Sequence, residues 1–288
     1  MKSVLEAKGL TKNFGRVTAV DNLDLEVPRG SVFGILGPNG SGKTTTLGMV
    51  LGVINPSAGE FHWFDGETGH DVRKRIGSIL ESPCFYHYLS ARQNLEITAE
   101  IKKVSHRRIP EVLERVSLLD RQNDPFKTYS LGMKQRLAIA SALLSDPEVM
   151  ILDEPTNGLD PAGIAEIRDL MIDLGNEGRT IITASHMLSE VQRICSDFAV
   201  LRKGRKIYQG KVHELNSENL RVELETENME NLSSHLAESA IVLNHRREGS
   251  FHIATLKEGA DPAALNSFLM ERGVSLSRLT PQTTSLEQ

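Results

Sequence analysis

The chain reads SVFGILGPNGSGKTTTLGMVL from residue 31 to residue 51, and this stretch decides the fold. The near-continuous apolar run of residues 31–36 is typical of a strand that is buried on both faces of a parallel sheet. Residues 37–44 match the pattern G-x-x-x-x-G-K-[ST], and residues 44–51 have the composition of a helix. A strand, a glycine-rich turn and a helix in this order predict a loop that binds the phosphates of a nucleotide.

The residue types of this loop suit a phosphate group. Glycines let backbone N–H groups curl around phosphate oxygens, and the N-terminus of the following helix adds partial positive charge. We expect Lys43 to reach the β- and γ-phosphates and the Thr44 hydroxyl to bind Mg²⁺. A chance match would occur in about one chain in a hundred of this length, and the strand–turn–helix context makes chance rarer still. The predicted nucleotide contacts in this segment are Gly37, Pro38, Asn39, Gly40, Ser41, Gly42, Lys43, Thr44 and Thr45.

A second apolar strand ends in two carboxylates, since residues 149–154 read VMILDE. In a parallel sheet the end of a strand is where ligands bind, here beside the phosphate loop. We expect Asp153 to hold Mg²⁺, largely through water, and Glu154 to orient and activate the attacking water. An acidic strand end by itself is more often a helix cap or a turn, but the phosphate loop reverses those odds.

The bulk properties bound the class of protein. The chain has 288 residues, enough for one or two domains, and a formal net charge of −5 without a long Lys or Arg block, which argues against nucleic-acid binding. No apolar run approaches the roughly 18 residues of a membrane-spanning helix, and the N-terminus lacks the apolar region of a secretory signal. Cys84 and Cys195 have no disulfide or metal-ligand spacing and fit a reducing compartment. If a membrane is involved, a partner must supply the spanning part.

Strands and helices alternate over residues 1–215, which predicts an α/β domain with a mostly parallel sheet. Between about residues 83 and 145 the pattern is helical, and Ser90 with Gln93 forms a capping-box pattern. The expected strands are 4–7, 23–27, 31–36, 149–152, 180–184 and 198–201, and the expected helices are 44–51, 91–103, 109–119, 131–144 and 161–174.

The character of the chain changes at residue 216. The expected order there is βαββαβ, with a helix from Asp261 to about residue 271 and a last strand at 274–279. This order predicts a small α+β, ferredoxin-like domain over residues 216–288. It contains no catalytic constellation, and we expect Arg246 and Arg247 to lie in a solvated hairpin turn.

Three further segments narrow the class of phosphate-loop protein. Residues 129–136 read YSLGMKQR, residues 155–160 read PTNGLD, and residues 183–186 read TASH. Together with the loop and the two carboxylates, they resemble in order the motifs of the ATP-binding subunits of ABC transporters: the signature, the D-loop and the switch histidine. The resemblance covers about residues 4–215. It implies the P-loop NTPase fold of an ABC ATPase with a helical subdomain, and ATP with Mg²⁺ as cofactors.

The resemblance also implies which residues perform hydrolysis. Lys43, Glu154 and His186 would be the catalytic residues, with His186 at the γ-phosphate, and Phe14 would lie under the adenine ring. A lone histidine is more often structural or on the surface. The position of His186 after a strand and downstream of the D-loop favours the γ-phosphate role.

Two such subunits pair head to tail, as a homodimer or with a related subunit, so that each ATP lies between one phosphate loop and the other signature. Ser130 and Gly132 would then contact the γ-phosphate held by the partner, and Asp160 belongs to the D-loop that completes the nucleotide site. The helical subdomain would carry the work to a membrane permease.

Two positions depart from the usual motifs of the family. The signature reads Ser-Leu-Gly-Met in place of Ser-Gly-Gly-Gln, which changes the side chains at Leu131 and Met133. Glu81 stands where the family usually has a glutamine. We expect Glu81 to be a Mg²⁺ ligand beside Thr44 and Asp153, and the alternative is a loop carboxylate that faces water. Both variants are similar to the branch of the family that exports bacitracin, lantibiotics and multiple drugs.

The function expected from these features is an ATPase at the cytoplasmic face of the cell membrane that drives a transmembrane permease, in the direction of export. One alternative is a soluble ABC-type ATPase that acts on ribosomes or nucleic acid, which the single cassette and the absence of a basic tract disfavour. Another is a nucleotide-gated regulator with the C-terminal domain as its sensor.

Overall fold

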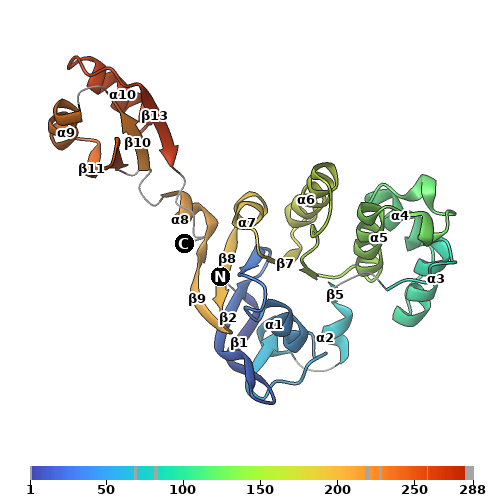
Figure 1. The fold of residues 1–288 in the computed structure, drawn as a ribbon. Helices are drawn as coiled ribbons and strands as arrows, with labels where there is room; N and C mark the ends of the chain where they lie inside the picture. The colour runs from blue at the N-terminus through green and yellow to red at the C-terminus, as the bar shows by residue number, and fades with distance from the viewer. Residues whose placement is uncertain are drawn as a thin grey trace. The chain divides into compact units, whose positions relative to one another are not determined.

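The computed structural model describes residues 2–67, 70–80, 84–217, 221–226, 229–257 and 259–282. The chain forms two compact units, residues 1–210 and residues 211–288 (Figure 1). The boundary predicted between residues 215 and 216 lies inside a short helix, α8 (Val212–Ser217), which belongs to the second unit.

A six-stranded sheet forms the centre of the first unit. Its strand order is β5 (Ile76–Ile79), β6 (Val149–Asp153), β7 (Thr180–Ser185), β3 (Val32–Leu36), β8 (Asp197–Arg202) and β9 (Arg205–Lys211). The first five of these strands run parallel, and β3 pairs with β7 on one side and β8 on the other. The mostly parallel sheet predicted from the alternation of strands and helices is confirmed.

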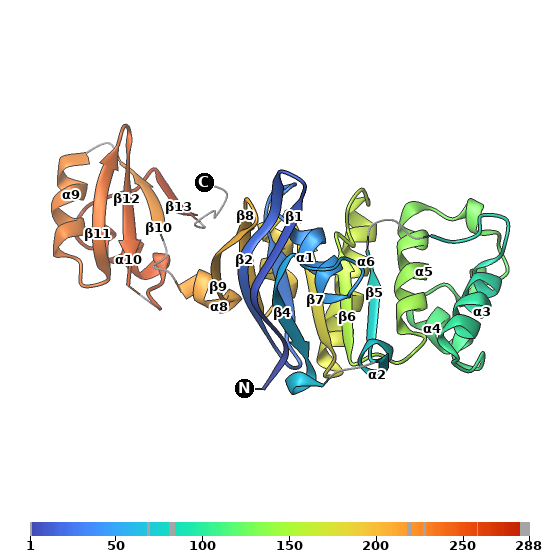
Figure 2. The same cartoon turned by 90° about the horizontal axis from the view of Figure 1, so that it is seen from below.

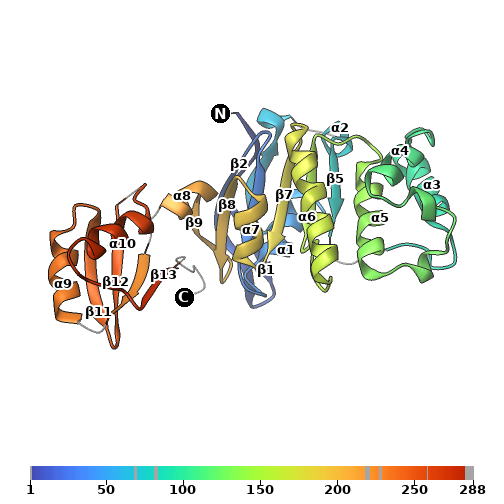
Figure 3. The same cartoon turned by 90° about the horizontal axis from the view of Figure 1, so that it is seen from above.

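The unbroken apolar run in β6 reflects burial on both faces of the sheet. Val149 and Ile151 belong to one hydrophobic cluster, which also holds residues of helix α1 (Lys43–Val50). Met150 and Leu152 point the other way and pack with residues of helix α6 (Pro161–Asn176) and of the helical segment predicted at about residues 83–145. Figure 2 is drawn from the α1 side and Figure 3 from the side of α6 and of α7 (Leu188–Ile194).

A second, three-stranded antiparallel sheet has the order β2 (Val17–Pro28), β1 (Ser3–Phe14), β4 (Ala58–Trp63). The sequence predicted only short pieces of β1 and β2, at 4–7 and 23–27, and did not predict β4. Repeated register shifts between β1 and β2 interrupt the period-2 pattern, and most side chains of β4 are exposed. The buried residues of β1 and β2 share the cluster that contains α1.

In its described residues, the helical segment of the first unit contains three α-helices, α3 (Ala91–Lys102), α4 (Arg108–Arg115) and α5 (Leu131–Leu143), with two short 3₁₀ helices between α4 and α5. The capping box of α3 is confirmed, since the Gln93 backbone N–H donates to Ser90 Oγ at 3.2 Å and the Ser90 N–H donates to Gln93 Oε1 at 2.9 Å. The prediction that α4 runs to residue 119 is wrong. Ser117 has a φ of +55°, which ends the helix, and the Leu118 N–H turns back to the Leu113 carbonyl at 2.8 Å.

The second unit has the predicted βαββαβ order: β10 (Arg221–Glu225), α9 (Met229–Glu238), β11 (Val242–Glu248), β12 (Phe251–Leu256), α10 (Pro262–Met270) and β13 (Arg278–Gln282). The sheet order β11-β12-β10-β13, with every adjacent pair antiparallel, is that of a ferredoxin-like fold. Its core includes Val222, Leu232 and Leu265.

Two local predictions for this unit are wrong. The last strand begins at residue 278 and not at 274, because Gly273 turns the chain with a φ of +74° and Val274 is buried in the core before the strand starts. Arg246 and Arg247 lie in strand β11, and the turn follows them at Gly249.

Candidate nucleotide site

The predicted phosphate loop lies between the end of β3 and the start of α1. The Gly37 N–H donates to the Ser185 carbonyl at 3.2 Å, which ties the loop to the end of β7. Gly42 has a φ of +102°, and a Cβ atom there would lie 2.6 Å from the Ala19 carbonyl oxygen. Both backbone conformation and space therefore require glycine at this position.

Lys43 begins α1 and is a buried charged side chain, with 6% of its surface exposed. Its ammonium donates to the Gly37 carbonyl at 2.7 Å and to the Pro38 carbonyl at 3.3 Å. It also lies 3.2 Å from Glu154 Oε1. A buried ammonium needs such partners, and these hold the charge directly beneath the loop.

Glu154 follows β6 in a left-handed backbone conformation, with a φ of +47°. Its N–H donates to the Ala184 carbonyl at 3.0 Å, and its carbonyl accepts from the Asn157 N–H at 3.1 Å. The second carboxylate oxygen, Oε2, lies 2.8 Å from His186 Nδ1. Because it faces a carboxylate, Nδ1 donates, which leaves Nε2 for another partner.

The three predicted catalytic residues therefore form one continuous chain, Lys43–Glu154–His186, although they come from the start of α1 and from the ends of β6 and β7. This edge of the sheet is where the parallel strands end, the usual ligand site in such folds. These three side chains combine an ammonium, a carboxylate and an imidazole. Such groups can bind phosphate and can accept or donate the protons of a water molecule.

The two described residues predicted to bind Mg²⁺ are at the same edge. Asp153 is the last residue of β6 and is 4% exposed, and Thr44 is exposed in the first turn of α1, beside the half-buried Thr45. A carboxylate and a hydroxyl are the hard oxygen ligands that Mg²⁺ prefers, so this donor set fits the ion. Glu81 lies outside the described residues.

The residues of the signature and D-loop have local roles at helix ends. Ser130 caps α5, since its Oγ accepts from the Met133 N–H at 3.3 Å. Within the described part of the chain, no hydrogen bond or ion pair joins Ser130 to the phosphate loop. A Cβ atom at Gly132 would meet only Leu159, at 4.0 Å. Asp160 caps α6 by accepting from the Gly163 N–H at 3.1 Å, a contact that by itself explains an aspartate there.

Phe14, predicted to lie under adenine, ends β1 with 51% of its surface exposed. Lys12 Nζ lies 5.1 Å from the centre of its ring. An exposed aromatic ring beside a cation offers a flat surface for stacking.

Glu190, in the first turn of α7, is a further residue of this region that the sequence did not predict. Its carboxylate accepts hydrogen bonds from Thr156, just after Glu154, and from Ser185, just before His186. No motif in the sequence marks this residue, because Thr156 follows β6 and Ser185 ends β7, and these two segments meet only in the fold.

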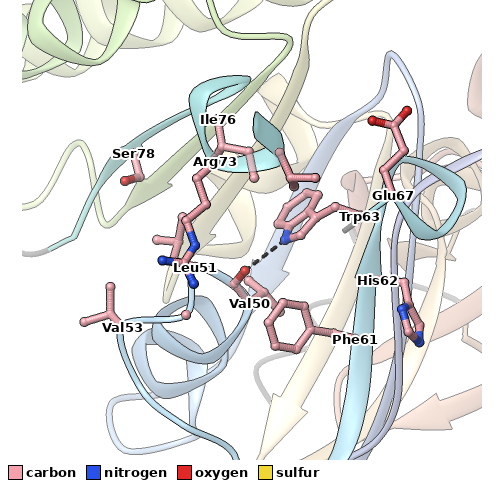
Figure 4. A pocket seen from close by; sticks show the side chains of 12 residues that line it. Val50, Leu51, Val53, Phe61, His62, Trp63, Glu67, Arg73, Ile76 and Ser78 are labelled. Atoms are coloured by element: carbon pink, nitrogen blue, oxygen red, sulfur yellow. Dashed lines mark hydrogen bonds between the residues drawn. The ribbon is translucent and has the colours of Figure 1, made fainter. Parts of the chain in front are cut away.

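Figure 4 shows a pocket elsewhere in the first unit, of about 390 Å³, between the end of α1 and strands β4 and β5. The Trp63 indole N–H donates to the Val50 carbonyl at 2.9 Å in its wall. Of the predicted site residues that the structure describes, none lines it. Separately, in the residues that the structure describes, no helix has the length and apolar character to cross a bilayer.

Comparison with known proteins agrees with this geometry. The ABC transporter family matches residues 20–157. The chain is 48% identical over 212 residues to YhcH, an ABC transporter ATP-binding protein of Bacillus subtilis, with 72% of this chain and 70% of YhcH covered. It is 36% identical over 304 residues to the bacitracin transport ATP-binding protein BcrA of Bacillus licheniformis, with 100% and 96% covered.

The fold is also that of a solved ATP-binding cassette. MJ0796, determined as a dimer in a post-hydrolysis state with ADP and phosphate, matches with a TM-score of 0.65 and 25% identity, over 72% of this chain and 98% of that one. Sequence motifs, site geometry and both kinds of similarity agree, and the chain belongs to the ABC transporter family as one of its ATP-binding, ATP-hydrolysing subunits.

Proposed function

We propose that the Lys43–Glu154–His186 chain is the hydrolytic centre of a subunit that drives a membrane permease in the direction of export. The single observation that carries this proposal is the placement of Glu154, with one carboxylate oxygen 3.2 Å from Lys43 Nζ and the other 2.8 Å from His186 Nδ1. Such a carboxylate is fixed in orientation and charge at the edge where the γ-phosphate would lie.

In this mechanism Glu154 orients a water molecule and accepts its proton as the water oxygen bonds to the γ-phosphorus. The bond from the γ-phosphorus to the β–γ bridging oxygen breaks, and ADP leaves. Lys43 balances the charge of the phosphate oxygens, and His186 contacts the γ-phosphate through Nε2. Residues 37–45 hold the phosphates and Phe14 stacks on the adenine.

The residues proposed to hold Mg²⁺ are Thr44 and Asp153, with Glu81 as a third ligand. When bound, the ion supplies positive charge that neutralises the phosphate oxygens. Glu81→Gln is expected to raise the Mg²⁺ concentration needed for half-maximal ATPase activity. An unchanged Mg²⁺ dependence and unchanged stimulation of the ATPase by the permease would remove Glu81 from the site.

Pairing of two subunits completes the site in this proposal. Ser130 and Gly132, at the N-terminus of α5, would contact the γ-phosphate bound to the other copy or to a related subunit, with Asp160 at the same contact. Support comes from the open space around Gly132 and from the dimeric state of the similar cassette MJ0796.

The proposed partner is a transmembrane permease subunit, which would hold this chain at the cytoplasmic face of the membrane. Residues 1–215 would be the ATPase domain, with the helical subdomain at about 83–145 as the coupling element, and residues 216–288 an accessory domain. The similarity to BcrA, a bacitracin transport ATP-binding protein, over nearly the whole chain supports a role in the transport of such a compound.

Glu154→Gln tests the centre of the proposal. The amide cannot accept a proton, so we expect ATP binding to persist, turnover to fall by about 100-fold or more, and an ATP-bound dimer to accumulate in size-exclusion chromatography. Asp169→Asn, at a carboxylate that is 68% exposed on α6, is the matched control and should leave all three unchanged. Wild-type turnover in Glu154→Gln would place the general base elsewhere.

The partner is tested by purification from membranes. The chain should co-purify with a polytopic membrane protein, and that protein should stimulate its ATPase activity. Stimulation by RNA or DNA, with no such membrane protein bound, would favour instead the soluble ATPase that acts on ribosomes or nucleic acid.

A further inference from the structure

Two buried hydroxyl groups converge on one carboxylate oxygen beside the proposed hydrolytic centre. Thr156 Oγ1 donates to Glu190 Oε2 at 2.8 Å, and Ser185 Oγ donates to the same oxygen at 3.2 Å. Thr156 is 6% exposed and Ser185 is 3% exposed. Glu190 therefore joins the loop after β6 to the end of β7.

Both donors are next to residues of the centre along the chain. Thr156 is two residues after Glu154, and Ser185 directly precedes His186. The Met187 N–H also donates to Ser185 Oγ at 3.1 Å, so the backbone on both sides of His186 is tied to the same hydroxyl. The hydrogen bonds run from the Met187 N–H through Ser185 to Glu190, with Thr156 as the second donor to the same carboxylate.

The two hydrogen bonds to Glu190 are stronger than hydrogen bonds between neutral groups. Each Glu190 contact has a charged acceptor, which makes it about twice as strong as a neutral hydrogen bond, and linked hydrogen bonds polarise one another. Without the carboxylate, two buried hydroxyls would lose their acceptor, which water cannot readily replace at such low exposure.

The backbone of Glu154 is held by two hydrogen bonds and has an unusual conformation. Its N–H bonds to Ala184 and its carbonyl to Asn157, while its left-handed conformation is one that a glutamate adopts only under constraint. The 2.8 Å contact between Glu154 and His186 depends on two loops keeping their separation. Glu190 contacts both segments at once, through Thr156 and Ser185.

We propose that Glu190 is a positioning residue for ATP hydrolysis: it fixes the loop of Glu154 against the loop of His186 without touching the nucleotide. This inference rests on the hydrolytic centre proposed above. A displacement of about 1 Å at a reacting group can cost on the order of 100-fold in rate, so the loss of this link acts on turnover. Within the described residues, no hydrogen bond or ion pair joins Glu190 to residues 37–45. Ser185 meets the loop through its backbone carbonyl and not through the hydroxyl that bonds to Glu190, so we expect nucleotide affinity to be spared.

The experiment compares steady-state ATPase kinetics of full-length variants, with kcat expressed per ATP-binding site from titration with a non-hydrolysable ATP analogue. We expect Glu190→Ala to lower kcat by about 10- to 100-fold and to leave KM for ATP within about twofold. Glu190→Gln keeps a carbonyl oxygen that can accept from both hydroxyls, and should recover most of kcat. Ser189→Ala, at the exposed neighbour on α7, is the control and should match the wild type.

The two donors supply a second measurement. Thr156→Val and Ser185→Ala should each lower kcat by less than Glu190→Ala does. Combined with Glu190→Ala, neither should add its full effect, because the link is already broken. Fully additive effects of both substitutions would show that the hydroxyls and the carboxylate act separately, and would overturn the inference.

Two further outcomes separate this inference from the proposed centre. Wild-type turnover in Glu154→Gln and His186→Ala would overturn the centre itself. Loss of turnover in those variants, with a wild-type kcat per binding site in Glu190→Ala, would overturn only the positioning role. Glu190→Ala could also reduce the number of ATP-binding sites and lower the melting temperature while kcat per site stays unchanged. That result would show that Glu190 has only a structural role.

Discussion

Two clusters of charge lie at opposite edges of the parallel sheet, and they differ in chemistry more than in size. At the carboxyl edge, Lys43, Glu154 and His186 form the proposed hydrolytic centre. At the amino edge, Asp146 lies 2.7 Å from Arg179 and 3.4 Å from Arg108. Both clusters bring together residues that are far apart in the sequence.

The amino-edge cluster consists of groups that stay charged. A guanidinium does not release its proton in proteins, and the hydrogen bond from Arg179, followed by that from Arg108, holds the pKa of Asp146 below its usual value against the effect of burial. The carboxyl edge, by contrast, holds an imidazole and a carboxylate, the kinds of side chain that act as general acids and bases in catalysis. The amino-edge ion pairs therefore have a structural role, whereas the carboxyl-edge cluster contains groups that can bind phosphate and transfer protons.

The largest effect that would test this comparison is expected at Lys43. Lys43→Met removes the buried ammonium beneath the phosphate loop, and we expect ATP hydrolysis to fall by about 1,000-fold or more, with weakened ATP binding. Arg179→Met removes a cation of similar size at the amino edge and should leave ATPase activity within about twofold. Comparable losses of activity in the two variants would contradict the assignment of a catalytic role to the carboxyl-edge cluster and a structural role to the amino-edge cluster.

His186→Ala should have the next largest effect. Loss of the imidazole leaves Glu154 with one charged partner and removes the proposed contact with the γ-phosphate, so kcat should fall by about 100-fold while ATP binding persists. Single-turnover measurements would separate the chemical step from product release. An unchanged chemical step would remove His186 from the centre and leave it as a surface histidine.

Lys102 can be compared with Lys43, because its side chain is also largely removed from solvent but lies away from the proposed hydrolytic centre. Its ammonium donates to the Ser141 carbonyl at 2.9 Å, and burial lowers its pKa to about 8. The folded state thus disfavours the charged form, so stability should increase as the pH rises from about 8 towards the ordinary lysine value. We expect a gain on the order of 2 kcal/mol over that range, measured by urea unfolding.

Lys102→Met should abolish this pH dependence, and Lys103→Met, at the exposed neighbour, should keep it. The opposite result would be a wild-type stability that falls over the same pH range relative to Lys102→Met. It would mean that the carbonyl partners favour the charged lysine, which would contradict this prediction.

The smallest effect is expected at Asp146, which is half exposed. Asp146→Asn, which suits the left-handed backbone there, should lower stability by less than about 1 kcal/mol at pH 7. Because the pKa of Asp146 is lowered in the folded state, the advantage of the wild type is present above the unfolded pKa and disappears as the pH falls through the folded pKa. Thermal melts of both proteins from pH 3 to 7 would check this, and an advantage that persists in acid would contradict it.

Much of the site could be predicted from the sequence because its parts are local. The phosphate loop is one continuous segment whose glycines are demanded by its own backbone, as Gly42 illustrates. Glu154 follows an apolar run that predicts a buried strand. Ser90 and Gln93 predict the N-cap of α3.

The parts that could not be predicted depend on contacts between distant segments. Strand β4 exposes most of its side chains, so its sequence carries little period-2 signal, and only its pairing with β1 makes it a strand. Helix α4 ends at Arg115 because Ser117 adopts a left-handed conformation, which its residue type does not announce. Glu190 is one more acidic residue on a short helix until the fold brings Thr156 and Ser185 to it.

The sequence by itself determined that this chain binds nucleotide and located the phosphate-loop segment that we propose holds it, since such a loop depends on local backbone freedom and local order of elements. It also determined the family, through motifs in a fixed order. Only the tertiary structure decided which charges meet: that Lys43 and His186 share the carboxylate of Glu154, and that Arg179 and Asp146 brace the other edge. Electrostatic partnership depends on distance in space, which a sequence does not contain.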